Sequence, residues 1–412
     1  MRVLFFFDSG GSLQNQNSTL AAQLFGMLVT ALIVLADAAP LFAEDAGAIA
    51  GSPGQVATLL ANPLVVTPKN LYSEASAGHF SPVVAGALQR VYVPNVLSSD
   101  VDVIDPATFQ VIDHFRVRGS PQHIVPSWDL KTLWIASSRH RHRRGGLTPI
   151  DPMTGMPGKT IPVSDAYNLY FTPDGKFAIV VAEAMERLEF RDPYTMLLKS
   201  TLAVPRCRGL NHADFSADGR YAIFTCEFEG SLVKIDLAEP RVDGYLKLSK
   251  GGMPQDIRIS PDGKSFYVAD MMADGVFVVD GDALAETDFI PTGIGAHGLY
   301  PSRDATKLYV SNRGSHEILA KPGGPGNVSV IDFATHKVET TWFIPGGGSP
   351  DMGNVSADGK VLWLSGRYDG VVYAINTTRG EVKSIAVGRQ PHGLTVWPQP
   401  GRYCLGHTGN MR

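Results

Sequence analysis

The stretch MPQDIRISPDGKSFYVADMMADGVFVVDGD, residues 253–282, contains a pattern that recurs along most of the chain. A strand-like segment, QDIRIS, runs into a Pro-Asp-Gly turn, and a second apolar segment, SFYVAD, follows it. Asp-Gly between two such segments is typical of a tight β-hairpin. A third segment, VFVVDG, continues the unit. The stretch therefore predicts antiparallel strands joined by short turns.

The Asp of this hairpin recurs at a nearly constant spacing. Equivalent positions are Asp129, Asp174, Asp218, Asp262, Asp304 and Asp358, which are 45, 44, 44, 42 and 54 residues apart. A period in the low forties with short β-segments is typical of a β-propeller, with one four-stranded blade per repeat. The longest interval contains an insertion, GSHEILAKPGGPG, at residues 314–326.

The second segment of the repeat occurs seven times, which predicts an all-β, seven-bladed propeller with four-stranded antiparallel blades. Its copies are RVYVPN, TLWIAS, FAIVVAE, YAIFTCE, SFYVAD, KLYVSN and VLWLSG. The first copy lacks a clear strand before it, and the C-terminus carries a spare one, PHGLTVWPQPG at residues 391–401. Pairing the N- and C-terminal strands removes two free sheet edges. The alternative is HFSPVVAG at residues 79–86; we favour closure by the C-terminus.

Composition and the N-terminus indicate an exported globular protein. Hydrophobic residues make up 44% of the 412 and charged residues 18%, and the net charge of −4 gives no specific signal for nucleic acid. Residues 24–36 form an apolar run of signal-peptide length, too short to span a bilayer. We expect a signal peptide at residues 1–43, a flexible lead-in at 44–87 and the propeller at 88–412. The alternative for the N-terminus is an unprocessed tail.

Export has consequences for location, assembly and cysteine chemistry. We expect a periplasmic or extracellular monomer with no transmembrane span after signal cleavage. The three cysteines are too few for a disulfide scaffold, and their odd number leaves one unpaired. In an exported protein Cys207 and Cys226 can form a disulfide, whereas two buried thiols are the alternative.

Several segments resemble the YVTN-repeat, YncE-like family of bacterial β-propellers. The segments are SPDGKSFYVAD, RDATKLYVSNRG, GNVSVIDFATHKVETTWFIPGG and RQPHGLTVWP, and the resemblance covers about residues 88–400. It implies the propeller fold but little about activity, because related propellers include lactonases, haem- or copper-carrying oxidoreductase domains, metal-binding proteins and pure binding modules.

Polar residues gather where the first strand of each repeat starts and the second ends, on one face of such a ring. One column is polar in all seven repeats: Gln122, Tyr167, Asn211, Gln255, His297, Asp351 and His392. The next column adds His123, Asn168, His212 and Asp256. The second-strand ends add Glu183, Glu227, Asp270 and Asn312, with Arg313 and Arg367 just beyond them.

These columns predict a binding site at one mouth of the central channel and none at the opposite mouth, which the hairpins form. Its predicted residues are His123, His212, His297, His392, Asp256, Asp351, Glu227, Asp270, Arg313 and Arg367. The four His residues are the candidate metal ligands, because imidazole with carboxylate suits a divalent ion such as Zn or Cu. An organic ligand, acid–base chemistry or a purely structural role are the alternatives. Because the two columns are adjacent in sequence, their side chains cannot all point the same way.

The sequence therefore favours an exported binding module that holds a small molecule, a metal ion or a protein partner at this mouth. The alternative is an enzyme, either a metal-dependent lactonase-like hydrolase or a periplasmic oxidoreductase subunit. The chain has no P-loop, dinucleotide fingerprint, Gly-x-Ser-x-Gly or His-Glu-x-x-His motif. It also has no Cys-x-x-Cys-His motif, which argues against covalently attached haem. A basic segment, SRHRHRRGG at residues 138–146, is expected on the same face.

Overall fold

The computed structural model describes residues 70–139, 144–405 and 410–412. The chain divides into two units, residues 1–47 and 48–412, and every described residue belongs to the second. The expected signal peptide, the first part of the lead-in and the centre of the basic segment lie outside the described residues. Within these described ranges, no helix has the length and apolar character needed to cross a membrane.

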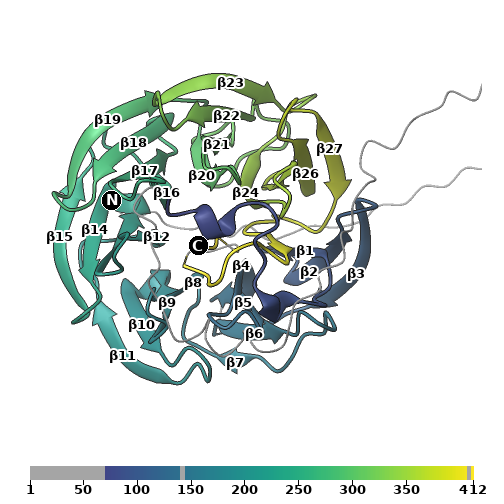
Figure 1. Ribbon diagram of the computed structural model, residues 1–412, viewed down its shortest axis with the longest axis horizontal. Helices are drawn as coiled ribbons and strands as arrows, with labels where there is room; N and C mark the ends of the chain where they lie inside the picture. The colour runs from purple at the N-terminus through teal and green to yellow at the C-terminus, as the bar shows by residue number, and fades with distance from the viewer. Residues whose placement is uncertain (1–69, 140–143, 406–409) are drawn as a thin grey trace, which may run out of the picture. The chain divides into compact units, whose positions relative to one another are not determined.

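Seven four-stranded antiparallel sheets stand in a ring, which confirms the predicted seven-bladed propeller (Figure 1). Blades 1 and 2 contain β28 (Thr395–Trp397), β1 (Arg90–Asn95), β2 (Asp100–Asp105) and β3 (Gln110–Arg116), then β4 (Ser120–Pro126), β5 (Leu133–Ser138), β6 (Gly146–Ile150) and β7 (Ile161–Pro162). Blades 3 and 4 contain β8 (Asn168–Phe171), β9 (Ala178–Ala182), β10 (Arg187–Arg191) and β11 (Leu198–Ala203), then β12 (Leu210–Phe215), β13 (Tyr221–Cys226), β14 (Ser231–Asp236) and β15 (Arg241–Lys247).

The remaining blades repeat the same order from the channel outward. Blades 5 and 6 contain β16 (Pro254–Ile259), β17 (Ser265–Asp270), β18 (Gly275–Asp280) and β19 (Ala285–Pro291), then β20 (Ala296–Pro301), β21 (Lys307–Asn312), β22 (Asn327–Asp332) and β23 (Lys337–Phe343). Blade 7 contains β24 (Pro350–Val355), β25 (Val361–Gly366), β26 (Val371–Asn376) and β27 (Val382–Ala386). Short 3-10 turns are η2 (Ser73–Ala75), η3 (Pro82–Val84), η4 (Glu183–Met185) and η5 (Glu227–Glu229).

The inner strands of each blade are covered on both faces, which explains their nearly continuous apolar sequences. In blade 1 the strands β1 and β2 are almost entirely buried, whereas the outermost strand β3 is mostly exposed. The apolar core lies between neighbouring blades. Tyr170 and Phe190 of blade 3, for example, share one cluster with Phe224 and Val233 of blade 4. Each blade is therefore stabilised mainly by its two neighbours.

The recurring Asp closes the hairpin between the first and second strands. In blade 5 the Asp262 Oδ1 accepts hydrogen bonds from the Ser260 hydroxyl at 2.6 Å and from the Lys264 N–H at 3.2 Å. Gly263, between these residues, has a φ of 75°, a conformation that favours glycine. The repeat in the sequence therefore reflects turn geometry rather than a binding function.

The C-terminus closes the ring, as we expected. Strand β28 pairs antiparallel with β1, and Arg90 lies opposite Trp397 while Tyr92 lies opposite Thr395. The alternative strand at residues 79–86 does not form: Phe80 makes only an isolated parallel bridge to Gly401, and η3 follows it. Two Pro residues at positions 82 and 398 are not part of the ladder.

Both terminal segments cover the end of the channel at which the hairpins lie, which we call the hairpin mouth. In Figure 1 the purple segment with η2 and the C-terminus lie over the centre of the ring. The Tyr72 hydroxyl donates to the Ile259 carbonyl at 2.8 Å, and Arg412 pairs with Asp214 at 2.8 Å. The ring of Tyr403 lies 4.7 Å from that of Trp128. The later part of the expected flexible lead-in, residues 70–87, thus packs against the propeller.

Candidate functional site

Four imidazoles from four blades meet inside the channel, near the end opposite the hairpins, which we call the histidine mouth. The ring centroids of His123 and His392 lie 4.7 Å apart, and those of His123 and His212 lie 5.2 Å apart. The ring of His297 is 6.3 Å from both His212 and His392. All four residues are at most 1% exposed. We call this group the histidine cluster; it lies deeper in the channel than a position on the rim.

Bulges in the first strands bring the two polar columns together. The register between the first and second strands shifts between Pro121 and His123 in β4, between Leu210 and Ala213 in β12, and between Ala296 and Gly298 in β20. A β-bulge inserts an extra residue and breaks the alternation of side chains between the two faces. The cluster therefore draws on both columns: His123 and His212 come from one, and His297 and His392 come from the other.

The imidazoles of the cluster are neutral near pH 7. Burial lowers the pKa of His123 to about 3 and that of His297 to about 4. Burial also lowers the pKa of His212 and His392 well below the usual value. A neutral imidazole can accept a hydrogen bond or ligate a metal through one ring nitrogen.

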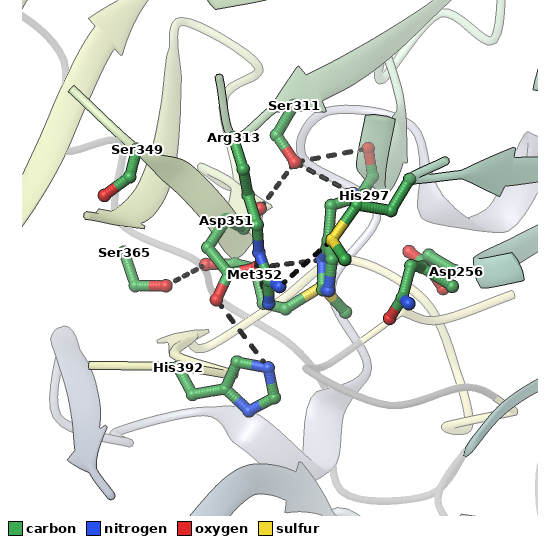
Figure 2. A network of polar contacts seen from close by, with 12 residues as sticks. Asp256, His297, Ser311, Arg313, Ser349, Asp351, Met352, Ser365 and His392 are labelled. Carbon is green, nitrogen blue, oxygen red and sulfur yellow. Dashed lines mark hydrogen bonds and ion pairs between the residues drawn. The ribbon is translucent and has the colours of Figure 1, made fainter. Parts of the chain in front are cut away.

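Asp351 is the centre of a buried polar network beside this cluster (Figure 2). Its Oδ1 lies 2.8 Å from both Nε and Nη2 of Arg313 and 2.8 Å from Nδ1 of His297. Its Oδ2 lies 3.7 Å from Nε2 of His392. Burial alone would raise the pKa of Asp351, but the positive charge of Arg313 holds it well below its usual range. Asp351 and Arg313 therefore form a buried ion pair.

Three of these side chains also have the composition of a metal site. Ligand atoms of His297, Asp351 and His392 all lie within 4.8 Å of one another. Two imidazoles with one carboxylate suit Zn²⁺. The guanidinium of Arg313, however, already occupies the Asp351 Oδ1 at 2.8 Å and would repel a divalent cation. The geometry thus offers ligands for a metal but places a competing positive charge among them.

The position directly after the second strand carries charges of opposite sign on different sides of the ring. In blades 4 to 7 its backbone N–H donates to the carbonyl that precedes the first strand, so these positions are equivalent. Around the ring the residues are Val96, Arg139, Glu183, Glu227, Met271, Arg313 and Arg367. Arg139 in blade 2 is exposed, whereas two acids stand in blades 3 and 4 and two arginines stand in blades 6 and 7. We call Glu183, Glu227, Arg313 and Arg367 the charged ring.

The acids of the charged ring hold their protons more tightly than usual. Burial raises the pKa of Glu183 to about 8, and the charges of Glu227 and Asp165 add to this effect. Burial also raises the pKa of Glu227, although hydrogen bonds and the arginines oppose the shift. The Glu227 Oε2 accepts a hydrogen bond from Asn211 Nδ2 at 3.0 Å.

Arg367 differs from Arg313 in its partners. Its Nε and Nη1 atoms are buried and have no hydrogen-bond partner among the described residues. Arg313 instead has Asp351, and its Nη1 also contacts Met271 Sδ at 3.6 Å. A guanidinium stays protonated in proteins, so Arg367 places a positive charge at the histidine mouth, where Asp351 attracts it but makes no hydrogen bond to its Nε or Nη1.

A family model of the YncE-like β-propeller matches residues 49–400 of the chain. The chain belongs to the YncE-like β-propeller family. Antigen Lp49 of Leptospira interrogans is 30% identical over 183 residues, which cover 39% of this chain and 37% of that relative. The match thus spans little more than a third of the relative's length.

Solved structures of similar fold have diverse functions. Pseudomonas aeruginosa periplasmic gluconolactonase superposes with a TM-score of 0.60 at 17% identity, covering 76% of this chain and 99% of that one. Dihydro-haem d1 dehydrogenase NirN superposes with a TM-score of 0.54 at 16% identity, covering 75% of each chain. Kuenenia stuttgartiensis hydrazine synthase superposes with a TM-score of 0.54 at 17% identity, covering 68% of this chain and 92% of that one. At these identities the likeness shows the fold alone.

Two of the ten predicted site residues in this YncE-like propeller use their carboxylates to hold the backbone. Asp256 accepts from the N–H groups of Ile257 and Leu299, each at 2.9 Å, and lies 3.0 Å from Arg258. The Oδ1 of Asp270 accepts from three backbone N–H groups, at 2.8 to 3.1 Å. We therefore leave both residues out of the site proposed below.

The cysteines and the insertion complete the surroundings of the site. Cys207 and Cys226 form a disulfide, so their sulfurs are not thiolate ligands for a metal. The insertion at residues 314–326 is tied to blade 7, because the Tyr368 hydroxyl donates to the carbonyls of Glu317 and Ile318 at 2.7 and 3.0 Å. Sequence reasoning had missed Tyr368, which directly follows Arg367, and Met352, whose Sδ lies 3.1 Å from His297 Nδ1.

Proposed function

We propose that this chain is an exported binding propeller that holds a small organic carboxylate at the histidine mouth. The observation that carries the proposal is the guanidinium of Arg367, whose buried Nε and Nη1 lack a partner among the described residues. A buried donor without a partner costs about 1–3 kcal/mol, and more when it is charged. A carboxylate would remove that cost.

The charge of the surroundings favours an anion over a cation. On the side of blades 6 and 7, Arg313 and Arg367 contribute two positive charges and Asp351 one negative charge, which leaves a net charge of +1 on that side. The histidine cluster adds no charge near pH 7, because burial lowers the pKa of each imidazole. An arginine fork also matches the two oxygens of a carboxylate in geometry.

Export to the periplasm or beyond is part of the proposal. The signal-peptide pattern at residues 1–43 supports it, as does the Cys207–Cys226 disulfide, since disulfides persist mainly in oxidising compartments. The likeness to a periplasmic gluconolactonase agrees with this location.

Substitution of Arg367 tests the carboxylate site. We expect pentanoate to bind the wild-type protein at one site in isothermal titration calorimetry. Arg367→Gln should weaken that binding about 10- to 150-fold, the equivalent of 1.5–3 kcal/mol for a hydrogen bond to a charged group. Arg139→Gln, at the equivalent position of blade 2 where the side chain is exposed, is the matched control and should change affinity less than about twofold. Equal affinity of wild type and Arg367→Gln for pentanoate would overturn the proposal.

A metal-dependent hydrolase, similar in activity to a lactonase, is the second candidate, and the grouping of His297, Asp351 and His392 favours it. We expect purified protein to hold far less than one zinc per chain, because Arg313 competes for Asp351. Arg313→Met should then raise zinc uptake, measured by elemental analysis after dialysis. One tightly held metal per wild-type chain that is lost in His297→Ala would favour the hydrolase and contradict the carboxylate site.

A further inference from the structure

We infer that the ligand is an amino carboxylate whose carboxylate meets Arg367 and whose ammonium group meets Glu183 and Glu227. This inference rests on the proposed function, because it adds a second contact to the same ligand. It names the class of molecule: a small zwitterion in which a protonated amine and a carboxylate stand at opposite ends.

The charged ring separates its two signs across the channel. Glu183 and Glu227 belong to neighbouring blades 3 and 4, whereas Arg313 and Arg367 belong to neighbouring blades 6 and 7. Blade 5 separates the two pairs on one side, and blades 1 and 2 separate them on the other. The positive and negative groups therefore face each other across the histidine mouth.

Tyr167 directly precedes β8 of blade 3 and reaches from the acidic side to the histidine cluster. Its ring is 5.4 Å from His123 and 6.2 Å from His392, so it stands at the histidine cluster. Burial raises the pKa of its hydroxyl well above the usual value, the charges of Glu183 and Glu227 raise it further, and those of Arg367 and Arg313 oppose the shift. A small molecule beside Tyr167 can therefore reach charges of both signs.

The acidic side also contains a buried acceptor that lacks a donor. The side chain of Asn211 is fully buried, and its Oδ1 has no hydrogen-bond partner among the described residues. Its Nδ2 donates to Glu227 Oε2 at 3.0 Å and to Gln255 Oε1 at 3.4 Å, which fixes the orientation of the amide. An ammonium group has three N–H donors, and Glu183, Glu227 and Asn211 Oδ1 together supply acceptors for it.

The two ends have complementary needs. On the arginine side, the Nε and Nη1 of Arg367 lack acceptors and the Oδ2 of Asp351 lacks a hydrogen-bond donor among the described residues. On the acidic side, the Oδ1 of Asn211 lacks a donor among them. A dicarboxylate would satisfy Arg367 but bring a second anion to Glu183 and Glu227. A diamine would pair with Glu183 and Glu227 but bring a second positive charge to Arg367. A zwitterion satisfies both sides at once.

The raised pKa values of the acids give the binding a proton signature. Glu183 faces Glu227, Asp165 and Tyr167, while Glu227 faces Asn211, Gln255 and the two arginines. With a pKa of about 8, Glu183 is largely protonated at pH 7. An ammonium group beside it would lower that pKa, so binding should release a proton and strengthen as the pH rises from about 6.5 to 8.5.

A matched series of five-carbon probes tests the inference: 5-aminopentanoate, pentanoate, glutarate and pentylamine, with 4-aminobutanoate and 6-aminohexanoate to vary the length. In calorimetry we expect the best amino carboxylate to bind at least about 10-fold more tightly than pentanoate, and glutarate to bind more weakly than pentanoate. Titration in two buffers of different ionisation enthalpy should detect proton release with the amino carboxylate but not with pentanoate.

Acid-to-amide variants assign the effect to the charged ring. Glu183→Gln combined with Glu227→Gln should remove the advantage of the amino group and leave pentanoate affinity within about threefold. Glu229→Gln, in the same turn as Glu227 but paired with Arg208, is the control and should keep the advantage. Pentanoate binding without any advantage of the amino group would overturn this inference and leave the proposed function standing. Failure of every carboxylate to bind would overturn both.

Discussion

A chain that ends at Gln390 is expected to lose the cooperative unfolding transition of the intact ring. The truncation removes β28, which pairs with β1, and with it the buried side chains of Leu394, Val396 and Trp397. Each buried apolar side chain of this kind contributes about 1.5–3 kcal/mol. Their loss is comparable to the whole stability of a typical domain, about 5–15 kcal/mol. Two exposed sheet edges would also promote aggregation.

Urea denaturation followed by circular dichroism, together with size-exclusion chromatography, measures this effect. A chain that ends at Pro400 is the control, because it keeps β28 and loses only the C-terminal one of the two segments that cover the hairpin mouth. We expect this control to unfold cooperatively at a lower urea concentration than the full chain. A Gln390 truncation with the same transition as the full chain would show that β28 does not close the ring.

Asp351→Asn is expected to lower the free energy of unfolding by about 3–5 kcal/mol, the cost of leaving one partner of a buried ion pair without the other. Asparagine keeps the shape of the side chain, so the loss in free energy of unfolding measures the effect of removing the negative charge. The pair of Arg313 with Asp351 is almost fully buried, with side chains 6% and 0% exposed. Because the pKa of Asp351 is depressed by folding, its contribution is present above about pH 4 and is lost as the pH falls through its folded value.

A double-mutant cycle separates the pair from its surroundings. Asp351→Asn with Arg313→Gln should be more stable than Asp351→Asn alone, with a coupling of about 1–3 kcal/mol measured by urea denaturation. Asp358→Asn, in an exposed hairpin, is the control, and we expect a loss of at most about 1 kcal/mol there. A loss below about 1 kcal/mol in Asp351→Asn would contradict the buried ion pair.

The fold was predictable from the sequence because its signal is local. The Asp-Gly hairpin uses side-chain hydrogen bonds to residues only two positions away, as Asp262 does with Ser260 and Lys264, so each repeat carries its own evidence. Ring closure was also predictable, because one strand was missing at Arg90 and one was spare at the C-terminus. Neither conclusion required knowledge of contacts between blades.

The geometry of the candidate site was predictable only in part, because it depends on contacts between blades. The grouping of the histidines followed from the repeat, but the bulges that bring His123 and His212 beside His297 leave no clear mark in the sequence. Asp256 was expected at the site, yet its acceptor capacity is used by Leu299 of the next blade. The pairing of Arg313 with Asp351 and the lack of a partner for Arg367 are likewise properties of the assembled ring.

The terminal segments over the hairpin mouth cover the channel at one of its two ends. Tyr72, held to Ile259, and Arg412, held to Asp214, stand at the closed end, so the histidine cluster is approached from the side of the charged ring. Ligands in a channel that is open at one end leave in the reverse of the order in which they entered. A molecule bound between Arg367 and Glu227 would block the dissociation of any ion or solute that had bound at the imidazoles before it. The residence time of a solute at the imidazoles would then be set by the dissociation rate of the molecule bound at the charged ring.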